Sequence, residues 1–455
     1  MESKWNGMAR DPDVIIIGAG MAGLAAAREL GRASLSVCLL EARGRIGGRV
    51  FTLHDPACNV PIELGAEFIH GRAREIWDPL ENAGAKITEV HGDSWCISDG
   101  KLSSCDFFEE VDSILEKMDD SVPDESFSAF LSRRFGEPQT NRQREAQQHA
   151  LSYVSGFNAA DPAQVGVHWL VREMRAEKKI QGDRAFRPGD GYTTLLNAFQ
   201  EQIAHFGVDV CTDTVVESVS WRAGNVKVSA RDARGTLLLE APRVLVTVPL
   251  SLLKTPPGQA GAVRFIPELP EQKRDALNRM EMGKVIRVVL RFRERFWESI
   301  KPSARSRKNL SHMAFLFSKS EWFPTWWTTM PEKSPVLTAW APFRSAERLS
   351  GQSESFMTER SLQTLSALLG PGIKELQNLL ERVYVHDWQS DPFSLGAYSY
   401  GKVGADGAQE AIAAPLENAL FFAGEATDTE GHNGTVHAAL ATGFRAAREI
   451  LQTSE

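Results

Sequence analysis

Three glycines follow an apolar run near the start of the chain. Residues 13–17 read DVIII, which is typical of a strand buried on both faces, and the helix-forming residues LAAAREL begin at position 24. Between them, Gly18, Gly20 and Gly23 form G-x-G-x-x-G. Glycines at these places allow a tight turn, close approach of the backbone to a pyrophosphate, and close packing of helix on strand. The pattern predicts a β–turn–α–β unit whose helix N-terminus faces the phosphates of a dinucleotide.

Glu41 ends the next apolar stretch, residues 36–41. A carboxylate at the end of the second strand of such a unit hydrogen-bonds a ribose hydroxyl of the dinucleotide. Because the same carboxylate repels a 2′-phosphate, the sequence disfavours NADP.

Composition narrows the class of protein. The chain has 455 residues, which favours two domains over one compact core. Its net charge of −8 gives nucleic acid no electrostatic reason to bind. Hydrophobic residues make up 42% and charged residues 24%, which is typical of soluble globular proteins. The N-terminus shows no apolar leader, and no segment has the roughly 18 apolar residues that cross a bilayer. We therefore expect no membrane partner.

The five cysteines show no metal-ligand spacing, so no metal site is predicted. We interpret them as five separate thiols, which suits a reducing compartment and favours a cytoplasmic location. They are Cys38, Cys58, Cys96, Cys105 and Cys211.

Residues 41–49, EARGRIGGR, directly follow the ribose carboxylate. This segment resembles the second FAD signature of the flavin amine oxidase superfamily, which has relatives among carotenoid desaturases and protoporphyrinogen oxidases. A Gly-Gly pair lets the backbone lie against a ring system, and Arg43 and Arg49 supply donors for pyrophosphate or flavin. The resemblance implies FAD as the cofactor.

The order of segments predicts an α/β fold. We expect a discontinuous Rossmann-like FAD-binding domain formed by residues 10–80, 187–280 and 410–455. An inserted α+β substrate-binding domain would comprise residues 81–186 and 281–409. Residues 81–186 are polar and helical in character without strand alternation, whereas 208–247 contain several strand-like runs. A last apolar strand near 420 precedes a helix that ends near 451.

Residues 63–71, ELGAEFIHG, resemble the segment of polyamine oxidases that passes the flavin ring. The resemblance places Gly65 and Ala66 beside the cofactor. His70 matches the position where animal polyamine and spermine oxidases carry a histidine facing the substrate channel. The alternative is a structural histidine that is hydrogen-bonded to backbone.

Residues 387–400 resemble a segment of polyamine oxidases and flavin-type histone lysine demethylases. The resemblance implies that Trp388 contacts the flavin and that Tyr398 forms an aromatic wall of the amine site, where it attracts ammonium by cation–π interaction. The alternative is two core aromatics in a strand pair. Monoamine oxidases attach flavin through a cysteine at the position of Ala397, so FAD should be non-covalent here.

Residues 421–443 match the C-terminal FAD motif of the same family. By that resemblance Gly424 and Glu425 contact FAD, with Glu425 holding a ribityl or ribose hydroxyl. A helix beginning at residues 434–436 would point its N-terminus, at Val436, toward the pyrimidine end of the flavin. Monoamine oxidases place a second tyrosine at the position of Thr435, so the two-tyrosine cage is half absent. Val216 aligns with the residue whose backbone holds the adenine.

One departure from the family concerns a lysine that holds a water near flavin N5. In this sequence, Arg287 stands at the position of that lysine. The nearby Lys284 lies three positions earlier, so in a strand it should face the opposite side. Ile286, Val288 and Leu290 alternate with Arg287, which either lies on a solvated face or replaces the lysine. A guanidinium is bulkier and always charged, so this exchange puts oxygen reactivity in doubt.

These observations predict FAD-dependent oxidation of a primary or secondary amine, polyamine or monoamine. Hydride would pass from the α-carbon to flavin N5, the imine would hydrolyse, and O₂ would become H₂O₂. Alternatives are an L-amino-acid oxidase with Arg287 pairing the carboxylate, a demethylase-like flavoprotein acting on a peptide partner, and a disfavoured desaturase. The Trp-rich residues 322–327 either line the substrate domain or pack in its core. The sequence leaves the oligomeric state open.

Overall fold

The computed structural model describes residues 3–4, 11–98, 100–302 and 308–453. The predicted domain limits at residues 10 and 455 lie outside these ranges, and the domain boundaries stay a prediction. The glycine motif belongs to a five-stranded parallel sheet of order β11-β3-β2-β15-β24. Its strands are β11 (Asp209–Cys211), β3 (Val37–Leu40), β2 (Val14–Ile17), β15 (Arg243–Val246) and β24 (Leu420–Phe422). This sheet confirms the predicted β–turn–α–β unit and joins segments from both ends of the chain.

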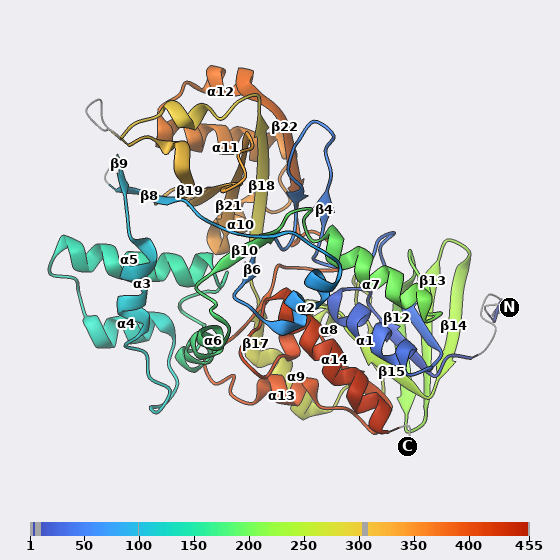
Figure 1. Cartoon of the computed structure of the whole chain (residues 1–455). Helices are drawn as coiled ribbons and strands as arrows, with labels where there is room; N and C mark the ends of the chain where they lie inside the picture. Colours follow the sequence, from blue (N-terminus) through green and yellow to red (C-terminus); the bar gives the residue numbers. More distant parts are fainter. Residues whose placement is uncertain (1–2, 5–10, 99, 303–307, 454–455) are drawn as a thin grey trace.

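Helices cover one face of the parallel sheet (Figure 1). They are α1 (Met21–Arg32), α2 (Arg74–Asn82), α7 (Thr193–His205) and α14 (Val436–Gln452), and α1 packs on both α7 and α14. Val14 and Ile16 belong to the core that these helices share, whereas Ile15 and Ile17 belong to the core on the opposite face. Because side chains alternate along a strand, β2 is buried on both faces, as its unbroken apolar sequence predicts.

A second sheet covers that opposite face. Its antiparallel strands are β12 (Val215–Arg222), β13 (Asn225–Asp232) and β14 (Gly235–Ala241). The short strands β16 (Arg264–Ile266) and β1 (Ser3–Lys4) extend it in parallel pairings. The strand-like runs in residues 208–247 are thus confirmed as strands.

A seven-stranded sheet of order β22-β18-β21-β20-β19-β8-β9 forms the upper part of Figure 1. Its strands are β8 (Asp93–Ser98), β9 (Lys101–Ser104), β18 (Val285–Phe292), β19 (Met313–Phe317), β20 (Thr325–Thr328), β21 (Val336–Pro342) and β22 (Leu380–His386). Apolar side chains of this sheet share a core with α10 (Phe343–Leu349), α11 (Glu354–Leu369) and α12 (Ile373–Leu379).

The middle of the chain is helical, as expected, but not throughout. Its helices are α3 (Phe107–Leu115), α4 (Phe127–Phe135), α5 (Asn141–Gly156) and α6 (Val167–Ile180). The expectation of no strands in residues 81–186 is wrong, because β8 and β9 lie there together with β7 (Ile87–Glu89) and the start of β10 (Ala185–Pro188). β8 shows little alternation because its side chains are buried on both faces, Trp95 in one core and Cys96 in another, and the exposed β9 has few apolar residues.

Short elements connect the sheets. They are β4 (Thr52–Leu53), β5 (Ile62–Glu63), β6 (Ile69–His70), α8 (Leu250–Lys254), α9 (Glu271–Arg279), β17 (Met280–Met282), β23 (Ser399–Gly401) and α13 (Ala408–Ala413). β10 pairs with β6 and β7, and β17 pairs with β23. Within the described ranges, no helix combines the length and apolarity needed to cross a membrane.

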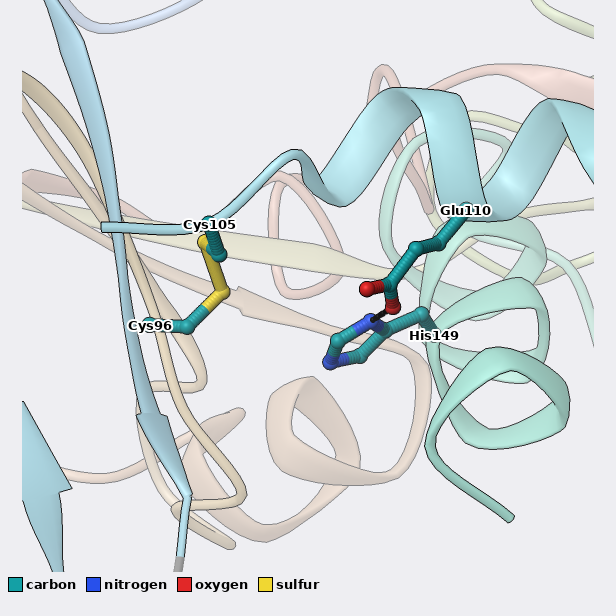
Figure 2. The surroundings of a disulfide bond; sticks show 4 residues. All are labelled: Cys96, Cys105, Glu110 and His149. Carbon is teal, nitrogen blue, oxygen red and sulfur yellow. Dashed lines mark hydrogen bonds and ion pairs between the residues drawn. A yellow bond between two sulfur atoms is a disulfide. The ribbon is translucent and has the colours of Figure 1, made fainter. Parts of the chain in front are cut away.

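The interpretation of the cysteines as five separate thiols is wrong for two of them. Cys96 in β8 and Cys105 just after β9 form a disulfide, with their Cα atoms 5.7 Å apart (Figure 2). The antiparallel pairing places Cys96 opposite Ser103, and the backbone N–H of Cys105 donates to Ser94 at 3.2 Å. The hairpin thus brings together two sulfurs whose spacing in the sequence gave no sign of pairing. Cys38, Cys58 and Cys211 are free.

Candidate active site

A cavity of about 900 Å³ lies where the parallel sheet, the seven-stranded sheet and the middle helices meet. All the predicted site residues line it except Gly23, which lies beneath the turn between β2 and α1. The lining residues among them are Gly18, Gly20, Glu41, Arg43, Arg49, Gly65, Ala66, His70, Val216, Arg287, Trp388, Tyr398, Gly424, Glu425, Thr435 and Val436.

The turn after β2 forms an open cradle at one end of the cavity. A Cβ on Gly23 would lie 1.9 Å from the carbonyl oxygen of Gly18, so helix and strand can approach this closely only with glycine there. A Cβ on Gly20 would meet only the Cα of Gly48, at 3.9 Å. α1 begins at Met21 with no side chain capping its N-terminus. The first N–H groups of α1 and the open glycine surface fit a pyrophosphate.

Glu41 is buried beside this cradle and is held by two backbone donors. Its carboxylate accepts from the N–H groups of Ala19 and Arg43, both at 2.9 Å. The Arg43 guanidinium bonds Asp391 at 2.7 Å instead of reaching across the cavity. Burial raises the pKa of Asp391, but hydrogen bonds from His386 and Arg43 outweigh it and lower that pKa to about 2. An anchored carboxylate next to an open phosphate cradle fits the ribose and pyrophosphate of FAD.

Glu425 connects three separate segments of the cavity wall. It accepts from Arg49 at 2.9 Å, from the Ser399 hydroxyl at 2.6 Å and from the Gly434 N–H at 3.1 Å. Arg49 also donates to the carbonyl of Ala397 at 2.7 Å. Glu425 therefore fixes the C-terminal motif against the segment that carries Tyr398, directly before β23, and its contact with a flavin hydroxyl stays a prediction.

Tyr398 forms a fixed aromatic wall. Its hydroxyl donates to the carbonyl of Phe157 at 2.7 Å, and a Cβ on Gly434 would lie 3.1 Å from its ring. Burial first, and then the negative charge of Glu173, raise the pKa of the phenol, so the ring stays neutral. Trp388 is buried and its indole N–H donates to Leu64 at 2.8 Å. Both aromatics border the cavity, which disfavours the interpretation as a simple core pair.

His70 lies in β6 among aromatic rings. Its ring centroid is 5.1 Å from that of Phe157 and 6.1 Å from that of Phe68. Burial lowers the pKa of His70 to about 4, so the imidazole is neutral near neutral pH. Among the residues the structure describes, no hydrogen bond to this ring is present, which disfavours a structural histidine tied to backbone.

Thr435 caps α14, which begins one residue later at Val436. Its hydroxyl accepts from the N–H of Ala438 at 3.1 Å and donates to the carbonyl of His432 at 2.6 Å. The N-cap alone explains a threonine at this position. A catalytic role of Thr435 stays a prediction.

Arg287 does not lie on a solvated face. It is 5% exposed, donates to the carbonyl of Glu63 at 2.8 Å and pairs with Glu67 at 3.3 Å. Lys284, directly before β18, points elsewhere and pairs with Glu347, which agrees with the expectation that it faces away from Arg287. The solvated alternative fails because residues 63–67, from the end of β5 onward, cover this face of β18 and supply the acceptors.

Sequence reasoning missed Glu67, the centre of a buried network. Glu67 accepts from Arg187 at 2.8 Å and from the indole N–H of Trp327 at 3.0 Å, and it pairs with Arg287. The guanidinium carbon of Arg287 lies 5.3 Å and 5.5 Å from the ring centroids of Trp327 and Trp340. The Trp-rich stretch has both proposed roles, because Trp326 is fully buried whereas Trp327 lines the cavity.

Sequence reasoning also missed the side chains that the middle helices contribute. Tyr153 and Phe157 come from α5 and its C-terminal end, and Glu173 and Glu177 come from α6. Two glutamates four positions apart on a helix are normally a solvated face, so no signal in the sequence distinguished them.

The chain is similar to known proteins over nearly its whole length. The family model described as flavin-containing amine oxidoreductase matches residues 21–107 and 107–451. The rice (Oryza sativa subsp. japonica) protein Polyamine oxidase 4 is 27% identical, with 97% of this chain and 89% of that protein covered. Lysine-specific histone demethylase 1 homolog 2 of Arabidopsis thaliana is 28% identical, covering 97% of this chain and 58% of that protein.

Two solved structures share the fold. Putrescine oxidase bound to putrescine superposes with a TM-score of 0.79 at 22% identity, covering 97% of this chain and 99% of that one. Cyclohexylamine oxidase from Brevibacterium oxydans superposes with a TM-score of 0.77 at 19% identity, covering 98% of this chain and 100% of that one. The family match agrees with the predicted α/β FAD-binding fold, and Ala397 offers no sulfur for a covalent link. The chain therefore belongs to the flavin-containing amine oxidoreductases, as an oxidoreductase that binds FAD non-covalently.

Proposed function

We propose that this enzyme oxidises a primary or secondary aliphatic amine and passes the electrons to O₂. One observation carries the proposal: a single cavity joins the glycine cradle to an aromatic chamber bounded by Tyr398, Phe157 and Trp327. The first part fits FAD, and the second fits a small cation that must lose its proton and its water shell.

The chamber residues bind and desolvate the amine. The faces of Tyr398 and Trp327 attract an ammonium group by cation–π interaction, and their rings exclude water once the neutral amine is bound. His70 adds no positive charge, because burial lowers its pKa to about 4, and a neutral ring nitrogen can accept a hydrogen bond from the amine. FAD, when bound, supplies the redox chemistry by accepting hydride from the α-carbon at N5 and reducing O₂ to H₂O₂. Hydrolysis of the imine then gives an aldehyde or ketone and an amine or ammonia.

Arg287 is a poor candidate for binding a substrate carboxylate. Its charge is paired with Glu67, and one of its N–H groups donates a hydrogen bond to the carbonyl of Glu63. An L-amino-acid oxidase needs a free guanidinium in the chamber, so this geometry disfavours that alternative. The similarity to histone demethylases keeps a methylated lysine peptide as a second substrate class to test.

A peroxide assay tests the proposal. Holoenzyme in air is mixed with polyamines, arylalkyl amines, amino acids and a methylated lysine peptide. We expect H₂O₂ from an aliphatic amine, whereas activity confined to amino acids or to the peptide would overturn the proposal. The cytoplasmic location stays a proposal. It was argued from five free thiols, and the Cys96–Cys105 disulfide removes that support.

A further inference from the structure

Two glutamates of α6 face the cavity beyond the aromatic chamber. Glu173 and Glu177 lie one helical turn apart, and both line the cavity. Tyr153 of α5 lines the same cavity, and burial first, followed by the charges of Glu177 and Glu173, raises the pKa of its phenol. The charge of Glu173 likewise raises the pKa of Tyr398. The two carboxylates therefore continue the chamber in which the reacting amine is bound.

Neither glutamate forms an ion pair with a basic side chain of the described residues. Both oxygens of Glu173 accept from the amide of Asn158, at 2.8 Å and 2.6 Å. Across the described ranges, no hydrogen bond or ion pair reaches the carboxylate of Glu177, and none of the ion pairs involves Glu173. Burial raises the pKa of both groups, that of Glu177 to about 7. A pair of carboxylates withdrawn from water in this way is unfavourable unless a cation joins it.

Asn158 supplies a second, independent sign of a ligand. It is 6% exposed and lines the cavity, yet its carbonyl oxygen has no hydrogen-bond partner. Buried polar atoms are nearly always paired, so an orphaned acceptor beside two unneutralised carboxylates suits a donor that carries several N–H groups. An ammonium has three donors and no acceptor, which matches a site made only of acceptors.

Acidic side chains outnumber basic ones in the neighbouring part of the cavity lining, to which Lys178 also contributes. Asp112 and Asp183 are exposed and border it, and their charges add to the raised pKa of Glu177. Glu89 also borders the cavity, but Arg184 neutralises it through a two-point pair. A path of acidic groups attracts cations of higher charge more strongly than singly charged ones.

We propose that Glu173, Glu177 and the Asn158 carbonyl form a subsite for the second ammonium group of an aliphatic diamine or longer polyamine. The first amine of that substrate lies in the chamber at Tyr398, so this inference rests on the proposed function. A singly charged amine fills the chamber and leaves the glutamate pair without a cation. The subsite thus selects substrates by charge at a distance from the reacting carbon.

Paired probes of equal chain length test the subsite in the FAD-loaded enzyme. Diaminobutane, diaminooctane and diaminododecane are compared with butylamine, octylamine and dodecylamine. Binding is measured by calorimetry without oxygen, and turnover by the rate of flavin reduction in stopped flow. The variants are Glu173→Gln, Glu177→Gln and their double mutant. Glu109→Gln, an exposed α3 glutamate outside the cavity, is the matched control.

We expect the wild type to prefer at least one diamine over its matched monoamine. A charge-assisted hydrogen bond is worth roughly 1.5–3 kcal/mol, so each Gln variant should lower that preference about tenfold to a hundredfold. Binding of the monoamine should stay within about twofold, as should both ligands in Glu109→Gln. Glu177→Gln breaks no protein hydrogen bond, so it carries the test alone if Glu173→Gln folds poorly.

Equal losses for diamine and monoamine would overturn the subsite, because they would show a structural role. An unchanged preference in the double mutant would overturn it as well. If glutamate-dependent diamine binding is found but no amine reduces the flavin, the subsite stands and the proposed oxidase activity fails. If monoamines and diamines reduce the flavin equally well in every variant, the activity stands and the subsite fails.

Discussion

Replacing Arg287 by methionine should destabilise the protein through a buried charge network. Methionine keeps much of the volume and apolar stem of arginine but removes the guanidinium. Glu67 would lose its 3.3 Å ion pair with Arg287 and keep its bonds from Arg187 and Trp327. The carbonyl of Glu63 would lose its 2.8 Å donor.

The expected size of the effect follows from these partners. Removing one member of a buried ion pair costs about 3–5 kcal/mol, and an unpaired buried carbonyl about 1–3 kcal/mol. Arg187 and Trp327 still donate to Glu67, and the new side chain packs against Trp327 and Trp340. We therefore expect a destabilisation at the lower end of the range for a broken buried ion pair. Arg287→Met should lower the free energy of unfolding by about 3 kcal/mol.

Urea unfolding at saturating FAD, followed by far-UV circular dichroism, measures the loss. Arg293→Met is the matched control, because Arg293 follows the same strand with its side chain 67% exposed and lies 3.9 Å from Glu381. A weak surface pair of this kind contributes at most about 1 kcal/mol. Equal midpoint shifts for the two variants would refute the buried network around Glu67.

Three further variants test other parts of the site. Gly23→Ala would place a methyl group 1.9 Å from the carbonyl oxygen of Gly18, so the ratio of flavin to protein absorbance should drop at least about tenfold; full flavin retention would contradict the cradle. Tyr398→Ala should lower amine turnover by about tenfold or more while flavin stays bound, and unchanged turnover would remove Tyr398 from the chamber. His70 takes up a proton below about pH 6.5 when unfolded but only below about 4 when folded. The wild type should therefore lose stability as the pH falls from about 6.5 to 4, at up to about 1.4 kcal/mol per pH unit, and His70→Gln should lose less. Parallel stability curves for the two proteins would exclude a neutral, buried His70.

The parts of the fold that local pattern encodes could be predicted. The run at residues 13–17, the glycines after it and the apolar stripe of α14 each have one physical explanation, and the structure contains β2, α1 and α14 at those places. Alternation also predicted that Arg287 and Lys284 point to different sides, and they contact different partners although Lys284 lies just before β18.

The remaining features depend on contacts between distant segments. Burial of Arg287 comes from the segment 63–67, which no pattern within β18 reveals. Glu173 resembles a solvated helix residue until α6 is seen to border the cavity. Cys96 and Cys105 pair because a hairpin folds them together, although β9 itself has few apolar residues to mark it as a strand.

Anaerobic mixing of the FAD-loaded enzyme with an aliphatic amine tests the central claim most directly. The account predicts that the visible absorbance of the oxidised flavin disappears in a single turnover and that admitting air restores it with release of H₂O₂. Tyr398→Ala, with the same flavin content, should bleach at least about tenfold more slowly. An unchanged flavin spectrum with every monoamine, diamine and polyamine tried would contradict the assignment of this chamber to amine oxidation.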